Sequence, residues 1–254
     1  MNIISPNWPA PENIVAFSTT REGGHSDGVY RGLNMAQHVG DACEKVGLNR
    51  AELTLELPAV TAIAWLTQTH GREVVEAGNS SGTPLADASW ASAPGVACAV
   101  MTADCLPVLL CSKNGNKIAA AHAGWRGLAQ GVLEACVVAM AIEPSDIMAW
   151  LGPAIGPDAF EVGGDVREQF LANCPAGQHT AVLQCFRGRE NKSGFFLADL
   201  YALARIRLNS AGVSEVFGGG LCTYTDASRF YSYRRDGQTG RMATIIAKIP
   251  DLNR

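Results

Sequence analysis

The sequence predicts a single α+β domain spanning residues 1–254. The first observation is that strand-like segments follow one another in runs, with helices inserted between them rather than in regular alternation. The second is that 254 residues, of which 47% are hydrophobic, are ample for one packed core. The third is that the chain contains no clean internal repeat and no linker long enough to divide it.

The N-terminal third is expected to hold a strand, a helix and two further strands. The helix is expected to begin near Asp41, whose carboxylate is a typical N-cap. The two later strands are expected to pair through a turn at His70 and Gly71, and residues 79–93 after them are expected to form a loop. The expected strands and helix are, in order, residues 14–18, 41–55, 60–67 and 72–77.

Three nearly continuous apolar runs form the centre of the sequence and are typical of strands buried on both faces. Residues 112–116 have the composition of a hairpin turn. The glycine-rich residues 124–127 precede a strongly apolar helix expected at 128–140. Such a turn is a weak candidate anion site, because free backbone N–H groups point outward there. The three runs are residues 96–102, 107–111 and 117–121.

The second half repeats this mixture of strands and helices. An apolar run leads into a turn at residues 152–157, which is rich in glycine and proline. Two helices and two strands are expected to follow. The apolar run is 147–151, the helices are 165–172 and 198–211, and the strands are 213–217 and 242–249.

Charge and hydropathy argue against several kinds of partner. The net charge is −4 and there is no basic tract, so nucleic acid is not expected as a partner. No apolar run approaches the ~20 residues that cross a bilayer, so no membrane is expected either. Residues 1–12 lack the features of a signal peptide, which predicts a cytoplasmic protein. The eight cysteines are therefore expected to be reduced thiols.

Three residues with metal-binding side chains lie at the ends of strand-like runs: His70, Cys105 and His122. Two imidazoles and one thiolate are a plausible ligand set for a catalytic zinc ion with an open fourth position. The three residues are far apart in the chain, so they form no local zinc-finger motif. The alternative is that the histidines bond to backbone in the core and Cys105 is a small buried hydrophobe.

Several segments together resemble the YfiH-type family, whose members carry names such as laccase-domain protein, polyphenol oxidase and purine nucleoside phosphorylase. The resemblance covers nearly the whole chain in the same order. The segments that carry it most strongly are TADCLP at 102–107, HAGWRG at 122–127, GPAIGP at 152–157 and RFYSYRRDG at 229–237, supported by TREGG at 20–24 and LNMAQHVGD at 33–41.

The resemblance implies that His70, Cys105 and His122 are metal ligands, most often for zinc, with copper as the other metal to consider. It implies a fold of mixed β-sheets flanked by helices, shared distantly with bacterial toxin deamidases that use a Cys–His pair. The implied activity is phosphorolysis of purine nucleosides (adenosine, inosine, guanosine or methylthioadenosine) with phosphate as co-substrate. Adenosine deamination is an additional activity of relatives.

Within the matching segments, Cys105, His122 and Asp104 are the candidate catalytic residues. Asp104 has an equally plausible role as a loop cap. Arginine suits phosphate because its planar guanidinium binds two oxygens at once, although most surface arginines bind nothing. The polar residues Asn34 and His38 could bind the ribose or the base, or could simply form turns. The candidate substrate-binding residues are Arg21, Asn34, His38, Arg126 and Arg234, with Arg21 and Arg234 favoured for phosphate.

Three other functions remain open. One is a metal-free amide hydrolase with Cys105 as nucleophile and His122 or His70 as base, which would suit relatives linked to editing a peptidoglycan precursor. Another is copper-dependent polyphenol oxidation at a single copper ion. The five histidines include no His-x-His pair and are too few for the coppers of a multicopper oxidase. A non-catalytic metal-binding module is the third.

Overall fold

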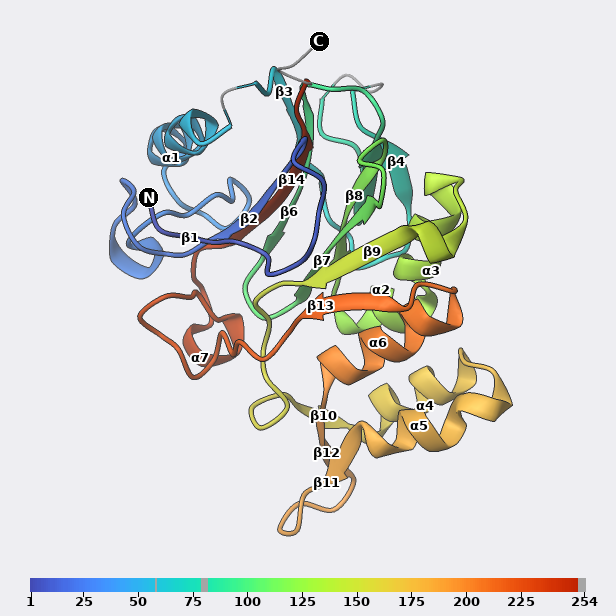
Figure 1. Ribbon diagram of the computed structural model, residues 1–254. Helices are drawn as coiled ribbons and strands as arrows, with labels where there is room; N and C mark the ends of the chain where they lie inside the picture. The colour runs from blue at the N-terminus through green and yellow to red at the C-terminus, as the bar shows by residue number, and fades with distance from the viewer. Residues whose placement is uncertain (58, 79–81, 251–254) are drawn as a thin grey trace.

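The computed structural model describes residues 1–57, 59–78 and 82–250. Two large mixed β-sheets lie face to face, and helices cover their outer sides (Figure 1). The predicted α+β fold class is confirmed. The five-stranded sheet has the order β1 (Ile3–Ile4), β2 (Ile14–Thr19), β14 (Met242–Lys248), β6 (Val96–Thr102) and β3 (Ala62–Ala64).

The second large sheet has six strands, and a smaller sheet of three strands lies beyond its helices. The six-stranded order is β13 (Glu215–Gly218), β9 (Ile147–Leu151), β7 (Leu106–Ser112), β8 (Ile118–Ala123), β5 (Ala88–Ala91) and β4 (Val74–Glu76). The three-stranded order is β10 (Glu161–Gly163), β12 (Phe195–Ala198) and β11 (Phe186–Gly188).

Helix α1 covers the outer face of the five-stranded sheet, whereas α2, α3 and α6 cover the outer face of the six-stranded sheet (Figure 1). Helices α4 and α5 pack beside the small sheet. The short α7 appears below β1 and β2 in the view of Figure 1. The helices are α1 (Cys43–Leu55), α2 (Trp125–Gln130), α3 (Val132–Met140), α4 (Gly164–Ala172), α5 (His179–Gln184), α6 (Leu200–Ser210) and α7 (Tyr233–Asp236).

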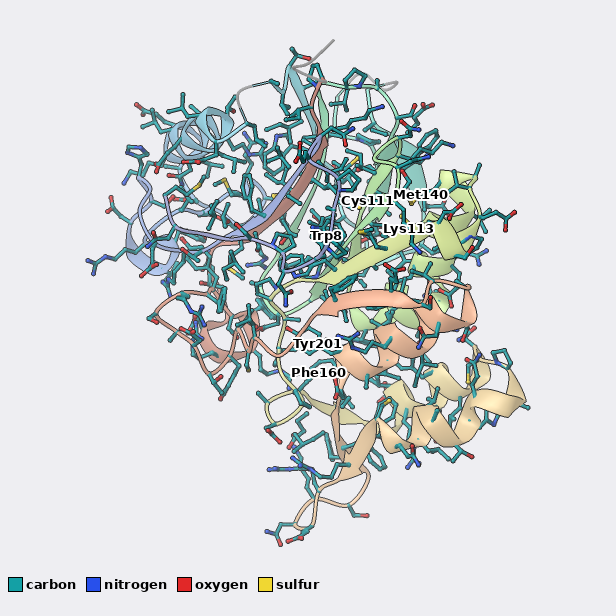
Figure 2. All side chains as sticks on the ribbon, in the orientation of Figure 1. Trp8, Cys111, Lys113, Met140, Phe160 and Tyr201 are labelled. Atoms are coloured by element: carbon teal, nitrogen blue, oxygen red, sulfur yellow. The ribbon has the colours of Figure 1, made fainter. Side chains whose placement is uncertain are left out.

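The central strands are buried on both faces, as their apolar runs predicted. In β7, Val108 and Leu110 pack toward the helices, whereas Leu109 and Cys111 pack between the two sheets. Cys111 and Trp8, both labelled in Figure 2, belong to this layer between the sheets. The predicted hairpin is also confirmed, because β7 and β8 pair antiparallel across residues 112–116. Because successive side chains of a strand point to opposite faces, the six-stranded sheet has one apolar core on each face.

The predicted hairpin between residues 60–67 and 72–77 is wrong. Strand β3 instead pairs parallel with β6, and β4 pairs parallel with β5 in the other sheet. Strand β5 lies inside residues 79–93, where a loop was expected; the first three of those residues lie outside the described part of the chain. Its small residues pack closely against the alanines of β8, so long-range pairing prevails over the local turn signal.

Two helix boundaries also differ from expectation. The helix predicted at 128–140 begins at Trp125 and is divided at Gly131, whose φ of 92° only glycine adopts without strain. Asp41 is not the N-cap of α1, since that position is Ala42. The Asp41 carboxylate instead accepts hydrogen bonds from the Ser26 hydroxyl and the Asn34 amide. Throughout residues 1–57, 59–78 and 82–250, no helix combines the length and apolar character needed to span a membrane.

Candidate metal centre

The structure brings His70, Cys105 and His122 together. Cys105 lies in the short link where the chain leaves β6 in one large sheet and enters β7 in the other, and His122 lies near the end of β8. His70 comes from the loop between β3 and β4. The candidate ligand atoms of the three residues all lie within 4.8 Å of one another, and Cys105 Sγ is 3.9 Å from His70 Nε2.

Asp87 orients His122. Its Oδ1 lies 2.8 Å from His122 Nδ1, and both side chains are almost fully buried. A proton on Nδ1 shared with this carboxylate leaves Nε2 as the nitrogen available to a metal ion. The main chain adds a second link, because the His122 N–H donates to the Asp87 carbonyl at 2.7 Å.

The same carboxylate also fixes the loop that carries His70. Asp87 Oδ2 accepts hydrogen bonds from the N–H and hydroxyl of Thr69 and from the Gly71 N–H, while Oδ1 accepts from the His70 N–H. These bonds hold His70 at a φ of 60°, which is uncommon for a residue with a side chain. One buried aspartate therefore positions two candidate ligands that lie far apart in the sequence.

Sequence reasoning missed Asp87, although one signal was present. Between Glu76 and Lys113 the only charged residues are Asp87 and Asp104, in a segment otherwise made of small, polar and apolar residues. An isolated acid in such a segment is expected to have a specific partner when it is buried.

The electrostatics of the site favour ionised groups. Burial opposes ionisation of Asp87, but hydrogen bonds from His122, Gly71 and Thr69 prevail and lower its pKa to about 2. Burial alone would raise the pKa of the Cys105 thiol, yet the nearby imidazoles of His122 and His70 lower it. Burial would lower the pKa of His122, but Cys105 and Asp87 raise it. The geometry thus favours a thiolate, the form in which cysteine binds metals.

Gly124, just before α2, leaves space beside all three candidate ligands. A Cβ at this position would lie 3.0 Å from His70 Cδ2, 3.2 Å from Cys105 Sγ and 3.4 Å from His122 Cε1. The two imidazoles and one thiolate fit a zinc ion with an open coordination position, and they also fit copper. The site opens into a cavity of about 400 Å³ lined by His38, Gln68, His70, Met101, Thr102, Ala103, Cys105, His122, Tyr233 and Arg241.

The carboxylate of Asp104 stabilises the local fold through two hydrogen bonds. Its Oδ1 accepts from the Thr223 hydroxyl at 2.6 Å and its Oδ2 from the Arg234 N–H at 2.7 Å. Asp104 has a φ of 96° next to Cys105, so these bonds hold a strained turn. Of its two predicted roles, the geometry supports the loop cap.

Asn34 likewise has its amide fully used within the protein. Its Nδ2 donates to the Ala36 carbonyl and to Asp41, and its Oδ1 accepts from the N–H groups of Ala36 and Arg241. Of the two interpretations of Asn34, the geometry supports the turn and not contact with a nucleoside. His38, the other polar residue predicted in that segment, does line the cavity.

The side chains of the three predicted arginines make other contacts. Arg21 stacks over the Tyr231 ring and lines a separate hollow at the surface. Arg126 stacks over Trp125 in α2, and Arg234 donates to the Glu161 carbonyl. Within the described part of the chain, the cavity lining includes none of these three arginines, so this geometry does not support their predicted roles. The arginine that does line the cavity is Arg241, which sequence reasoning missed.

Comparisons with known proteins assign the family. The model of a family described as multi-copper polyphenol oxidoreductase laccase matches residues 15–248. The chain belongs to this family. Relatives include a purine nucleoside phosphorylase from Pseudomonas aeruginosa, 50% identical over 96% of this chain and 97% of that protein. Another is the purine nucleoside phosphorylase YfiH of Escherichia coli, 49% identical over 96% of this chain and 98% of that protein. The predicted resemblance to YfiH-type proteins is confirmed.

Solved structures of this laccase-type family share the fold. A Neisseria meningitidis protein superimposes with a TM-score of 0.92 at 49% identity, covering 98% of this chain and 100% of that one. YlmD from Geobacillus stearothermophilus gives a TM-score of 0.90 at 31% identity, covering 98% of this chain and 97% of that one. The arrangement of sheets that creates the His70–Cys105–His122 cluster is therefore embedded in a fold common to these proteins.

Proposed function

We propose that the protein is a zinc-dependent purine nucleoside phosphorylase. The observation that carries the proposal is the convergence of His70, Cys105 and His122 in the wall of a cavity of about 400 Å³. Relatives at 50% and 49% identity bear the name of this activity. The proposed substrates are adenosine, inosine, guanosine or methylthioadenosine, with phosphate. The proposed location is the cytoplasm, where thiols stay reduced and Cys105 would remain available as a ligand.

The reaction exchanges one bond at the ribose for another. A phosphate oxygen forms a bond to C1′ as the bond from C1′ to the purine nitrogen breaks, and the electron pair leaves with the base. The hydrogen of HPO₄²⁻ balances the proton that the base gains. A bound zinc ion would supply Lewis-acid stabilisation of negative charge in this cavity.

The residues of the chain prepare the cavity for this reaction. Asp87 keeps the His122 ring in one orientation and keeps the loop of His70 in place. The Gln68 side chain bonds both the N–H and the carbonyl of Met101, which fixes the part of the cavity wall that these two residues form. A site held by such bonds loses little free energy to reorganisation when substrates bind.

The direct test follows the products of adenosine and phosphate with protein of known zinc content. We expect adenine and ribose 1-phosphate, with the activity lost on chelation and restored by zinc. Inosine among the products would show the additional adenosine deamination that we propose for the same site. His122→Ala and Cys105→Ala should lose zinc and activity while they stay folded, and full activity in a metal-free His122→Ala variant would exclude the proposal.

The family's copper-oxidase name suggests phenol oxidation as a minor activity. Among the described residues only one cluster of three metal-binding side chains forms, which is enough for a single copper ion. We propose that any polyphenol oxidation belongs to protein with copper in this cluster. The copper-loaded protein should then oxidise a phenol and the zinc-loaded protein should not; failure of the copper form removes this activity.

A metal-free amide hydrolase is the second candidate, and the lowered pKa of the Cys105 thiol favours it. In that case Cys105 would be the nucleophile and His122 or His70 its base. Zinc-bound thiolate reacts slowly with iodoacetamide, whereas a catalytic thiolate reacts fast. Slow alkylation of Cys105 that accelerates after chelation supports the metal enzyme; fast alkylation in freshly purified protein supports the hydrolase.

A further inference from the structure

Two arginines and one histidine lie in or next to the cavity of the candidate metal centre. Arg241 immediately precedes β14, Arg50 comes from α1, and His38 lies in the loop before α1. Arg241 and His38 line the metal cavity, while Arg50 and His38 line an adjoining cavity of about 300 Å³. The two cavities share His38, Gln68 and Met101, so they meet at His38.

The two guanidinium groups lack a carboxylate partner. Arg50 donates from Nε to the Met35 carbonyl and stacks over the Trp65 ring at 4.0 Å. Arg241 donates from Nη1 to the carbonyls of Thr239 and Gly240. In the described part of the chain, neither arginine forms an ion pair. Both are half-buried, and burial lowers the pKa of each.

The negative groups nearest Arg241 belong to the site itself. Burial lowers the pKa of Arg241, and the charges of Cys105 and Asp104 act in the opposite direction. Burial and the positive charges of Arg241 and Arg50 lower the pKa of His38, which suits a neutral imidazole that donates a hydrogen bond. Asp104 already uses both oxygens for Thr223 and Arg234, and Cys105 is a candidate metal ligand. Half-buried cations without a counter-ion are unfavourable unless an anion binds there.

One short segment positions both arginines. The Arg241 N–H donates to Asn34 Oδ1, and the Met35 N–H donates to the Arg241 carbonyl. The carbonyl of the same Met35 accepts from Arg50 Nε at 2.9 Å. The Asn34 side chain and the Met35 main chain thus tie the backbone of Arg241 and the guanidinium of Arg50 to the same two residues, which is a form of the preorganisation that an anion site requires.

Thr102 supplies an independent observation. It lines the metal cavity at the end of β6, is 2% exposed, and its hydroxyl has no hydrogen-bond partner among the described residues. A buried hydroxyl without a partner is unfavourable, so a group that binds in the cavity is expected to bond to it.

We propose that Arg241, Arg50 and His38, together with the Thr102 hydroxyl, bind the phosphate co-substrate. The inference rests on the proposed phosphorolysis and names the residues that would hold its phosphate, in place of Arg21 and Arg234. Two planar guanidinium groups can each bind two phosphate oxygens. Arg241 lines the same cavity as Cys105, and Arg50 lines the adjoining cavity, so the phosphate would lie next to the metal centre.

The test compares Arg241→Gln and Arg50→Gln in the zinc-loaded protein, with phosphate and adenosine varied separately. Loss of one charged hydrogen bond should raise the phosphate KM by about 10- to 100-fold. The adenosine KM and the zinc content should change little. Arg187→Gln is the matched control, since Arg187 is an exposed residue of β11 paired with Asp158. Thr102→Val is a third variant, because it removes the hydroxyl without removing any bond of the fold.

A second measurement titrates inorganic phosphate into the zinc-loaded wild type and variants without a nucleoside, by calorimetry. Phosphate binding to the wild type but not to the Arg241→Gln variant would support the phosphate site. If the same wild-type protein turned over no nucleoside, the phosphate site would be retained and the phosphorylase proposal would be rejected. If turnover proceeds with an unchanged phosphate KM in the Arg241, Arg50 and Thr102 variants, phosphorolysis stands and this inference is overturned. A raised phosphate KM in Arg21→Gln or Arg234→Gln alone would also overturn it.

Discussion

Asp87 is the residue on which the geometry of the candidate metal centre most depends. Its two carboxylate oxygens bond to His122 and to three consecutive residues of the His70 loop. Among the described contacts, no other carboxylate accepts hydrogen bonds from His122 or from the loop of His70. The relative positions of the two imidazoles therefore depend mainly on the hydrogen bonds of one side chain.

Asp87→Asn should weaken metal binding without removing a ligand. The amide keeps the size of the side chain but has only one acceptor oxygen, so it cannot accept all the present hydrogen bonds. Replacing such a ligand-orienting carboxylate lowers metal affinity by roughly 10- to 100-fold. Competition with a chelating dye measures this change. Asp158→Asn on the exposed surface is the control, and equal zinc affinity in both variants would contradict the role given to Asp87.

Asp87 should also contribute to stability in a pH-dependent manner. Its folded pKa is about 2 and its usual value is 3.8, so the folded state favours the ionised form. The contribution, about 2–3 kcal/mol, is present above pH 3.8 and is lost as the pH falls toward 2. Urea unfolding of metal-free wild type and Asp87→Asn between pH 5 and pH 2 checks it. The difference between the two proteins should shrink as the pH falls; a constant difference would show that the pKa is not lowered.

The start of helix α2 lies against the three candidate ligands. Gly124 has φ −60° and ψ 153°, which any residue adopts. Glycine is therefore required here because a side chain would crowd the candidate ligands, and not because of the backbone conformation. Helix α2 thereby brings its first turn against Cys105 and the two imidazoles.

Gly124→Ala should therefore impair the metal site more than the fold. Its Cβ would lie 3.0–3.4 Å from atoms of His70, Cys105 and His122, and at least one of them must move. We expect zinc affinity to fall at least about tenfold while the metal-free protein keeps a melting temperature near that of the wild type. Gly47→Ala, in α1 with open space around it, should instead stabilise by about 0.5–1 kcal/mol. Normal zinc binding in Gly124→Ala would show that the site tolerates the methyl group.

The elements that sequence reasoning predicted best are those that depend on neighbouring residues. The apolar runs of β6, β7 and β8 and the turn between the last two were predicted because pattern and pairing are local. The parallel pairing of β4 and the presence of β5 in an expected loop were not predicted, because they depend on pairing with β8 and on the Asp87 contacts that hold the His70 loop. The joint use of His70 and Cys105 as metal ligands was suggested by their chemistry and their places at strand ends, and the family resemblance strengthened it, since no periodicity links residues so far apart.

The choice of arginines shows the same limit. Arg21, Arg126 and Arg234 were selected because they lie in the recognisable segments, whereas Arg241 lies just beyond one of them. Its approach to the cavity depends on Asn34 and Met35, about two hundred positions earlier. Nothing in a single sequence reports that contact.

The first and last strands of the protein belong to one sheet. Strand β14 lies between β2 and β6, so the last strand completes the middle of a sheet begun by the first. The Tyr231 hydroxyl adds a link by donating to the Tyr30 carbonyl at 2.8 Å. The small sheet and helices α4 and α5 are peripheral in Figure 1, yet Phe170 and Phe186 belong to the same core as the six-stranded sheet.

The metal-free protein should consequently unfold in a single cooperative transition, as the single-domain prediction requires. Removing β14 would expose both neighbouring strand edges and the apolar layers on either side, so no large part of the chain can remain folded alone. Calorimetry should give a ratio of calorimetric to van't Hoff enthalpy close to one. A chain ending at Arg241 should show no cooperative melting. A separate transition that disappears when residues 161–198 are replaced by a short linker would instead show that this peripheral part is an independent domain.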